Sequence, residues 1–320
     1  MNPMKLKPVY KDYLWGGNEL EKLYDKAGDG EITAESWELC CHPDGMSVIA
    51  NGKYKGKYLK NILDESPKMV RPGQKRGEKF PILIKFIDAK KDLSIQVHPS
   101  DETAIKEAGE EGKAEMWYVI AAKPKAFLYY GLSRRVEKEE LRQRMEDGSI
   151  CDICNKVRVA PGDVFFIHPG TIHAIGAGTV IAEIQQSSNT TFRVYDFKRK
   201  DKNGNTRELH IDRAIDVIDR EPVVPSQVMD NNEVRTKNGL IRRLFGCEYF
   251  HVLLIHVKKD RMKLWCDDSS FHSLLIIRGE GHLEHKGKRY QFRSGDSYFL
   301  PAGIGEYQIY GECKVLLSKV

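Results

Sequence analysis

The chain has 320 residues, 41% of them hydrophobic, so it is long enough to bury a substantial core and by size predicts about two domains. Its 51 Lys and Arg residues and 46 Asp and Glu residues are interspersed and leave a formal net charge of only +5, which gives no indication of nucleic-acid binding. No stretch approaches the roughly 18 apolar residues that a membrane span needs, so we expect no membrane partner.

The first ten residues carry lysines but lack the apolar run of a signal peptide. The seven cysteines are an odd number without the regular spacing of a secreted disulfide scaffold. Cys151-x-x-Cys154 resembles half of a zinc site or a redox pair, but no second pair follows it. We therefore interpret these thiols as structural and expect a cytoplasmic protein.

Most segments are short, rich in Val, Ile, Phe and Tyr, and bounded by Gly, Pro, Asp or Asn, a pattern typical of an all-β sandwich or barrel. The clearest predicted strands cover residues 81–87, 116–121, 126–131, 164–168 and 274–278. Two helices are expected to interrupt them. The first covers residues 101–110 behind a Ser100/Asp101 cap, and the second covers 136–147 between a Ser133 cap and Gly148.

Residues 219–239 combine Pro, Asn and charge with little periodicity, so we expect a linker there. Strands resume after it, and no helix is predicted. This divides the chain into a domain of residues 1–225, with the helical insertions, and a domain of residues 226–320.

An internal repeat relates the two predicted domains. Gly162-Asp163-x4-His168-Pro169-Gly170-x2-His173 is echoed by Gly295-Asp296-x4-Pro301-Ala302-Gly303-x2-Glu306. Each copy predicts a turn, an apolar strand and a second turn, so we expect two domains of one fold. Glutamate stands where the first copy has histidine, which predicts that the second domain has lost a metal site.

Four residues offer metal-ligating atoms. Gln96 and His98 lie two positions apart, so on an extended strand their side chains share a face. Glu115 begins an apolar, strand-like segment where a charge would need a partner such as a cation, and His173 follows the first repeat's Pro-Gly turn. Two nitrogen and two oxygen donors suit zinc, although chemistry alone leaves Mn, Fe and a purely structural role open.

These segments resemble the two motifs of the cupin superfamily, and specifically type I mannose-6-phosphate isomerases of the short bacterial form. Where that family usually has Pro-Ala-Gly before the turn to histidine, this chain has His168-Pro169-Gly170, with the spacing to His173 unchanged. We interpret His168 and His42 as structural. The resembling segments are Trp15-Gly16-Gly17, Glu35-Ser36-Trp37-Glu38, His42-Pro43-Asp44-Gly45, Phe80-Pro81-Ile82-Leu83-Ile84-Lys85, residues 94–102, residues 112–118 and residues 183–197.

The resemblance implies two cupin jelly-roll domains, of which the first carries the site and the second is metal-free. It also implies one Zn²⁺ per chain held by Gln96, His98, Glu115 and His173, and an isomerisation of mannose 6-phosphate and fructose 6-phosphate through an enediol. Arg193 matches the family's catalytic arginine, although an ion pair with Asp196 is the alternative. Lys113 and Glu183 match polar active-site positions and are the candidate acid/base pair.

A sugar phosphate is the expected small-molecule partner, and its phosphate needs cationic or hydroxyl donors. Ser94, Lys198 and Arg199 are candidates by their position near these motifs. Two other readings of a cupin stay open: a sugar-phosphate sensor without catalysis, and an oxygenase that uses Fe(II). The sequence gives no oligomeric state.

Overall fold

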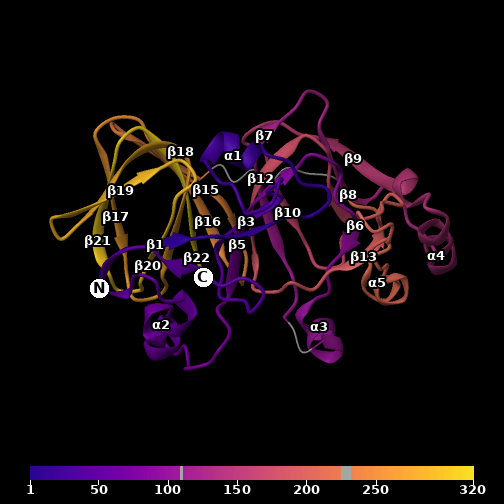
Figure 1. Ribbon diagram of the computed structural model, residues 1–320, viewed down its shortest axis with the longest axis horizontal. Helices are drawn as coiled ribbons and strands as arrows, with labels where there is room; N and C mark the ends of the chain where they lie inside the picture. Colours follow the sequence, from indigo (N-terminus) through magenta and orange to yellow (C-terminus); the bar gives the residue numbers. More distant parts are fainter. Residues whose placement is uncertain (109–110, 225–231) are drawn as a thin grey trace.

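A computed structural model describes residues 1–108, 111–224 and 232–320, and antiparallel strands dominate it. Figure 1 shows two β-rich bodies side by side along the long axis, with the C-terminal residues at the left and helices α4 and α5 at the far right. This confirms the predicted all-β fold. No helix in the described ranges is long and apolar enough to cross a membrane.

Two sheets build the body on the right of Figure 1. In strand order, the first sheet consists of β10 (Val164–Ile167), β7 (Glu115–Ala122), β12 (Thr179–Gln186), β5 (Ile82–Ala89), β3 (Glu35–Leu39) and β2 (Val9–Lys11). The second sheet consists of β13 (Phe192–Tyr195), β6 (Ile95–Val97), β11 (His173–Ile175), β8 (Phe127–Leu132) and β9 (Cys154–Arg158).

A third, larger sheet builds the other body. Its main path consists of β14 (Glu233–Thr236), β15 (Gly239–Gly246), β16 (His251–Val257), β22 (Cys313–Lys319), β18 (His272–His285), β20 (Ser297–Leu300), β1 (Met4–Lys7) and β4 (Val48–Ile49). The long β18 also pairs with β19 (Lys288–Arg293) and β21 (Gly305–Tyr310), and β21 pairs with β17 (Arg261–Cys266). Because β18 bends from one layer into the other, the body closes around its own core.

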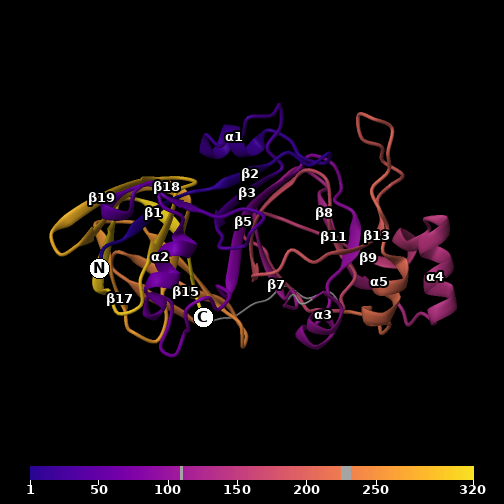
Figure 2. The same ribbon diagram turned by 60° about the horizontal axis from the view of Figure 1, so that its bottom comes forward.

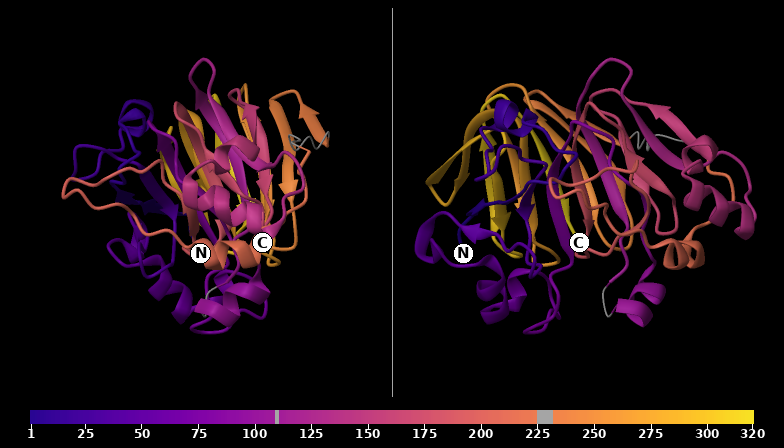
Figure 3. Two further views of the ribbon diagram at one scale, coloured as in Figure 1. Left: turned by 90° about the vertical axis from the view of Figure 1, so that its right-hand side faces the viewer. Right: turned by 45° about the vertical axis from the view of Figure 1, so that its right-hand side comes forward.

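The first sheet lies between two cores. Figure 3 shows its strands from the side, between the second and third sheets. Strands β5 and β12 are buried at every position. Side chains alternate along a strand, so Phe86 and Ala182 join the core shared with the third sheet. Lys85 and Glu183, directly paired in register, point the other way, toward the second sheet. This alternation brings buried charges to the inside of the first body.

Both predicted helices form, as α3 (Asp101–Ala108) and α4 (Lys138–Asp147), and the predicted end of the first at 109–110 lies outside the described residues. Helix α4 ends at Gly148, whose φ of 86° suits glycine. The Ser133 cap is wrong, because the Ser133 hydroxyl donates to the Ile153 carbonyl at 3.0 Å. Further helical segments were not predicted: α1 (Glu19–Tyr24), α2 (Leu59–Glu65), α5 (Ile211–Val217), η1 (Gly52–Tyr54), η2 (Pro67–Met69) and η3 (Ile150–Ile153).

The predicted linker is only partly a linker. Residues 225–231 lie outside the described residues, but β14 (Glu233–Thr236) pairs with β15, which corrects the end of the linker. The predicted boundary at 225/226 stays a prediction. At the other end of the chain, β1 pairs with β20, so Met4 opposes Phe299 and the N-terminus lies beside the C-terminal body (Figures 1 and 2).

The repeat is visible in the strand pairing. Strand β10 pairs with β7, and its counterpart β20 pairs with β18. The repeated glycines Gly162 and Gly295 both have positive φ, 99° and 89°, as required where the chain turns into each strand. After β10 the chain turns into β11, and after β20 it turns into β21. Both bodies thus repeat the same strand, turn and strand.

Candidate metal centre and substrate cavity

Three of the four predicted ligands converge inside the first body. One ligand atom each from His98, Glu115 and His173 lies within 4.8 Å of the others, and all three residues are buried. His98 directly follows β6, Glu115 begins β7 and His173 begins β11. The cluster is therefore built between the first and second sheets, from segments that are far apart in sequence.

Backbone carbonyls orient both imidazoles. Nδ1 of His98 lies 3.0 Å from the Thr190 carbonyl, and Nδ1 of His173 lies 2.8 Å from the Thr171 carbonyl. With Nδ1–H as the donor in each case, Nε2 is left with its lone pair. These Nε2 atoms lie 3.1 and 3.8 Å from the Glu115 carboxylate. Such a backbone contact behind a histidine is the usual support of a metal ligand.

The cluster leaves polar atoms buried without hydrogen bonds. His173 Nε2 has no hydrogen-bond partner among the described residues, and Glu115 Oε1 accepts no hydrogen bond there, although the Lys113 ammonium lies 3.0 Å from it. A buried polar atom without a partner typically costs about 1–3 kcal/mol. A cation between them would remove this cost, and imidazole nitrogens with a carboxylate are suitable donors for a divalent metal. The residues present therefore fit a metal ion.

The charge states also suit ligands. Burial, reinforced by the charge of Lys113, lowers the pKa of His98 to about 3, which keeps the imidazole neutral. Burial alone would raise the pKa of Glu115. The Lys113 ammonium, 3.0 Å away, and His98 outweigh burial and hold the pKa of Glu115 well below its ordinary value.

Gln96 lies beside the cluster on β6. In register it opposes His173 of β11 on one side and Arg193 of β13 on the other. Its side chain lines the neighbouring cavity. Sheet pairing thus places the predicted fourth ligand between a cluster member and the predicted catalytic arginine, while its coordination of the metal stays a prediction.

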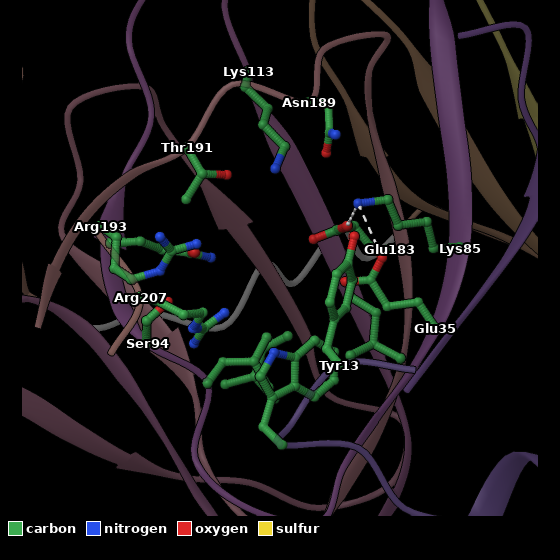
Figure 4. A pocket seen from close by; sticks show the side chains of 15 residues that line it. Tyr13, Glu35, Lys85, Ser94, Lys113, Glu183, Asn189, Thr191, Arg193 and Arg207 are labelled. Atoms are coloured by element: carbon green, nitrogen blue, oxygen red, sulfur yellow. Dashed lines mark ion pairs between the residues drawn. The ribbon is translucent and has the colours of Figure 1, made fainter. Parts of the chain in front are cut away.

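A cavity of about 240 Å³ opens next to the cluster. Figure 4 shows Arg193, Arg207 and Ser94 around one part of it, Lys85, Glu183, Glu35 and Tyr13 around another, and Lys113 at the top between them. The structure brings the predicted residues Ser94, Gln96, Lys113, Glu183 and Arg193 together here. Lys113 connects the cavity with the cluster, since its Nζ lies 3.5 Å from His98 Nε2.

Glu183 belongs to a buried network that sequence reasoning did not find. Its Oε1 accepts a hydrogen bond from Trp117 Nε1 at 2.9 Å, and its Oε2 lies 3.3 Å from Lys85 Nζ. Burial, with the charge of Glu115, raises the pKa of Glu183 to about 7. Lys85 also lies 3.7 Å from Glu35, and these carboxylates outweigh burial and raise its pKa, so it stays charged. The available signal was a lysine within the apolar run of residues 82–89.

Arg193 does not form the ion pair that the sequence left open. Asp196 is held by Arg199 and Arg207 instead. Arg193 donates from Nη1 to the Glu208 carbonyl at 2.9 Å, and its Nε is buried without a partner among the described residues. The guanidinium therefore has donors free beside the cavity.

The structure does not bring Lys198 or Arg199 to the cavity. Lys198 is exposed, with a φ of 53°, and neither residue lines the cavity. Arg207, which sequence reasoning missed, does line it. Its only sequence signal was a basic residue shortly before α5, which is common on any solvated loop.

The residues interpreted as structural behave as expected. His168 packs edge-on against Phe166, with ring centroids 4.3 Å apart, and is not part of the cluster. His42 accepts a hydrogen bond from the Asp44 amide at 3.1 Å within its turn. Cys151 and Cys154 are free thiols, and Cys154 is buried.

Comparisons with known proteins agree with this site. The model of the type I phosphomannose isomerase catalytic domain matches residues 4–128, and the model of the mannose-6-phosphate isomerase cupin domain matches residues 241–320. Mannose-6-phosphate isomerase ManA of Bacillus subtilis is 38% identical over 99% of this chain and 98% of its own. Mannose-6-phosphate isomerase of Streptococcus mutans is 35% identical over 99% and 98%.

A solved structure extends the agreement to three dimensions. The crystal structure of the Bacillus subtilis mannose 6-phosphate isomerase superposes with a TM-score of 0.93 at 34% identity and covers 100% of both chains. Two β-rich bodies, a cupin-domain match in the second of them, a buried His/Glu/His cluster and full-length similarity thus agree. The chain belongs to the type I mannose-6-phosphate isomerase family of enzymes.

Proposed function

We propose that this chain is a zinc-dependent aldose–ketose isomerase that interconverts D-mannose 6-phosphate and D-fructose 6-phosphate. One Zn²⁺ per chain would be held by Gln96, His98, Glu115 and His173. The names of the full-length relatives support the reaction, and the two imidazoles and the carboxylate with unpartnered buried atoms support the metal. Zinc is the preferred ion because it commonly takes nitrogen and oxygen ligands of this kind.

The reaction moves a hydrogen between C1 and C2, which requires a proton acceptor, a proton donor and stabilisation of the negative charge on oxygen in an enediol-type intermediate. A bound zinc ion would act as a Lewis acid on the sugar oxygens. Lys113 and Glu183, both buried at the cavity wall, are the acid/base pair that we propose. Arg193, a permanent cation with a free Nε, stabilises the developing oxyanion.

The observation that carries this proposal is the convergence of different chemical tasks on one cavity. Lys113 lies between the His/Glu/His cluster and the open space, Glu183 is fixed by Trp117 and Lys85, and Arg193 lies on the next strand to Gln96. Ser94 adds a hydroxyl for substrate binding. The free state of all seven cysteines supports our further proposal that the protein works in the reducing cytoplasm.

A coupled assay that follows the conversion of mannose 6-phosphate to fructose 6-phosphate tests the proposal. We expect turnover in zinc-loaded protein, loss after chelation, recovery with zinc, and no recovery in His98→Ala. His272→Gln is the matched control, because it changes a buried histidine of the other body.

Absence of turnover in zinc-loaded wild type would overturn the isomerase proposal. Sugar-phosphate binding without turnover would then favour a sensor, and oxygen uptake by Fe(II)-loaded protein would favour an oxygenase.

A further inference from the structure

The basic end of the cavity contains more positive charge than its carboxylate neutralises. Arg193 and Arg207 line the cavity, and Arg199 lies behind them against Asp196. Three guanidinium groups around one carboxylate leave two positive charges at this end. The carboxylate of the adjacent Glu208 is exposed and lies 4.0 Å from His210, so it offsets these charges only weakly.

Arg193 lies close enough to Arg207 for the two charges to repel. Burial lowers the pKa of Arg193, the charge of Arg207 lowers it further, and Asp196 opposes this effect. Like charges are brought together in this way at considerable cost unless an anion joins them. The end of the cavity is therefore suited to a ligand with a negative charge of about two, which is the charge of a phosphate monoester near neutral pH.

Arg207 is fixed in place and still has a donor to offer. Its Nε donates to Asp196 Oδ2 at 2.8 Å, and its Nη2 donates to Oδ1 of the same carboxylate. Nη1 has no protein partner within the described ranges of the chain. Arg199, by contrast, uses its Nε, Nη1 and Nη2 on Asp196 and on the Asp92 carbonyl. Of the two arginines on Asp196, only Arg207 has a terminal nitrogen without a protein partner among the described residues.

The position of this end matches the shape of the substrate. Figure 4 shows Arg193, Arg207 and Ser94 on one side of the cavity and Glu183 with Lys85 on the other. In a hexose 6-phosphate, the phosphate lies at the opposite end of the carbon chain from C1 and C2. A sugar with its reacting carbons near Glu183 and Lys113 therefore directs its phosphate toward the arginines. Because Arg193 is assigned to the developing oxyanion, Arg207 is the arginine left for the phosphate.

We propose that Arg207, held by Asp196, binds the substrate's phosphate and makes the enzyme select phosphorylated over unphosphorylated sugars. This inference rests on the proposed function. Arg207 acts on binding and takes no part in moving protons. Planar guanidinium donors are well suited to phosphate oxygens, and the fork with Asp196 orients Arg207 before the ligand arrives.

The test compares Arg207→Gln with wild type in the zinc-loaded enzyme. Loss of a hydrogen bond between charged groups should raise KM for mannose 6-phosphate by about 10- to 100-fold, while kcat stays within about threefold. Activity on unphosphorylated mannose should fall far less than activity on mannose 6-phosphate, because mannose has no phosphate for Arg207 to bind. Arg207→Lys, which keeps the charge but loses the fork, should have an intermediate KM.

Calorimetric titration with inorganic phosphate gives a readout that does not depend on turnover. We expect Arg207→Gln to weaken phosphate binding by about tenfold or more. Arg144→Gln is the matched control, because Arg144 is similarly exposed, 26% against 24%, and also pairs with a carboxylate, but lies on α4. Circular dichroism would verify that each variant is folded.

The outcomes separate the two proposals. Equal KM and equal phosphate affinity in Arg207→Gln and Arg144→Gln would overturn the role of Arg207 and leave the isomerase proposal standing. Phosphate binding that depends on Arg207 in a wild-type protein without turnover would support the anion site and contradict the isomerase.

Discussion

The two bodies share a strand arrangement but fill it differently. The repeat aligns Phe165 of β10 with Tyr298 of β20, so their pairing partners correspond as well. Trp117, which opposes Phe165, corresponds to Leu274, which opposes Tyr298. The same pairing can be followed from each strand to the next. It matches each inward-facing residue of the first sheet with one residue of the third sheet.

The positions that hold the buried polar network in one body hold leucine in the other. Register equates Lys85 with Leu253, Trp117 with Leu274, and Glu183 with Leu317. Leu274 and Leu317 belong to the core of the C-terminal body, and Leu253 packs against it.

The comparison shows that the cavity of the first body replaces stabilising apolar packing. Burying a leucine side chain contributes about 1.5–3 kcal/mol, whereas burying a charged group is favourable only when partners neutralise it. The first body holds Lys85 between Glu35 and Glu183 and leaves open space beside them. The C-terminal body uses the same positions for apolar packing. We therefore interpret the C-terminal body as a stabilising counterpart of the one that binds substrate.

Exchanging residues between equivalent positions tests this interpretation most severely. Leu317→Glu places a carboxylate in an apolar core without a cation, so it should destabilise the protein by more than about 4 kcal/mol. The reverse change, Glu183→Leu, should lower kcat by about 10²- to 10⁴-fold with a smaller loss of stability, because Glu35 still neutralises Lys85. Urea unfolding and steady-state kinetics measure the two effects. Similar losses of stability in both variants would contradict the comparison.

The two repeat-end residues give the next largest contrast. His173 is fully buried with its Nε2 toward Glu115, whereas Glu306, its counterpart, is half exposed and lies 3.6 Å from Lys263. His173→Ala should lose bound metal and lower kcat/KM by about 10³-fold, the equivalent of several kcal/mol of Lewis-acid stabilisation. Glu306→Ala should change neither. Mass spectrometry measures the metal content of each variant, and the coupled assay measures kcat/KM. Loss of metal in Glu306→Ala would contradict the comparison, because it would indicate a metal site in the C-terminal body.

A smaller effect is expected from pH. His272, which register equates with Glu115, is buried with its Nδ1 2.9 Å from the Tyr307 hydroxyl. Burial, with the charge of Lys319, lowers the pKa of His272 to about 4, while Asp267 opposes this weakly. The unfolded chain, with a histidine pKa of about 6.5, then binds more protons between these values. Stability should therefore decrease as pH falls from about 6.5 toward 4, by roughly 1–3 kcal/mol.

His272→Gln removes the titrating group and serves as the comparison. Its free energy of unfolding should change less than that of wild type between pH 7 and pH 4.5, measured by urea titration. Equal pH dependence in the two proteins would show that other groups dominate.

Much of the fold follows from local patterns. Apolar runs bounded by turn residues predicted β5, β7, β8, β10 and part of β18, and Gly148 predicted the end of α4, whereas the predicted Ser133 cap was wrong. Short helices such as α1 and α5 were missed, because six or seven residues carry too weak a periodicity and their stability comes from packing.

The site residues also fall into a group that the sequence predicted and a group that it did not. His98, Glu115 and His173 were accessible from sequence because motif spacing and family resemblance point to them, and the structure brings their donors together. Lys85 and Arg207 were not, because a single lysine in a strand or arginine in a loop carries no local signal of what it faces.

The sequence by itself determined the strand content and the repeat, because alternation and turn chemistry act over a few residues, and family resemblance added the members of the cluster. Only the tertiary structure decided that β1 completes a sheet with β20 nearly 300 residues later. It also decided that Arg193 stays free of Asp196 while Arg207 takes its place. Such choices depend on which distant side chains compete for one partner, and that competition exists only after the chain has folded.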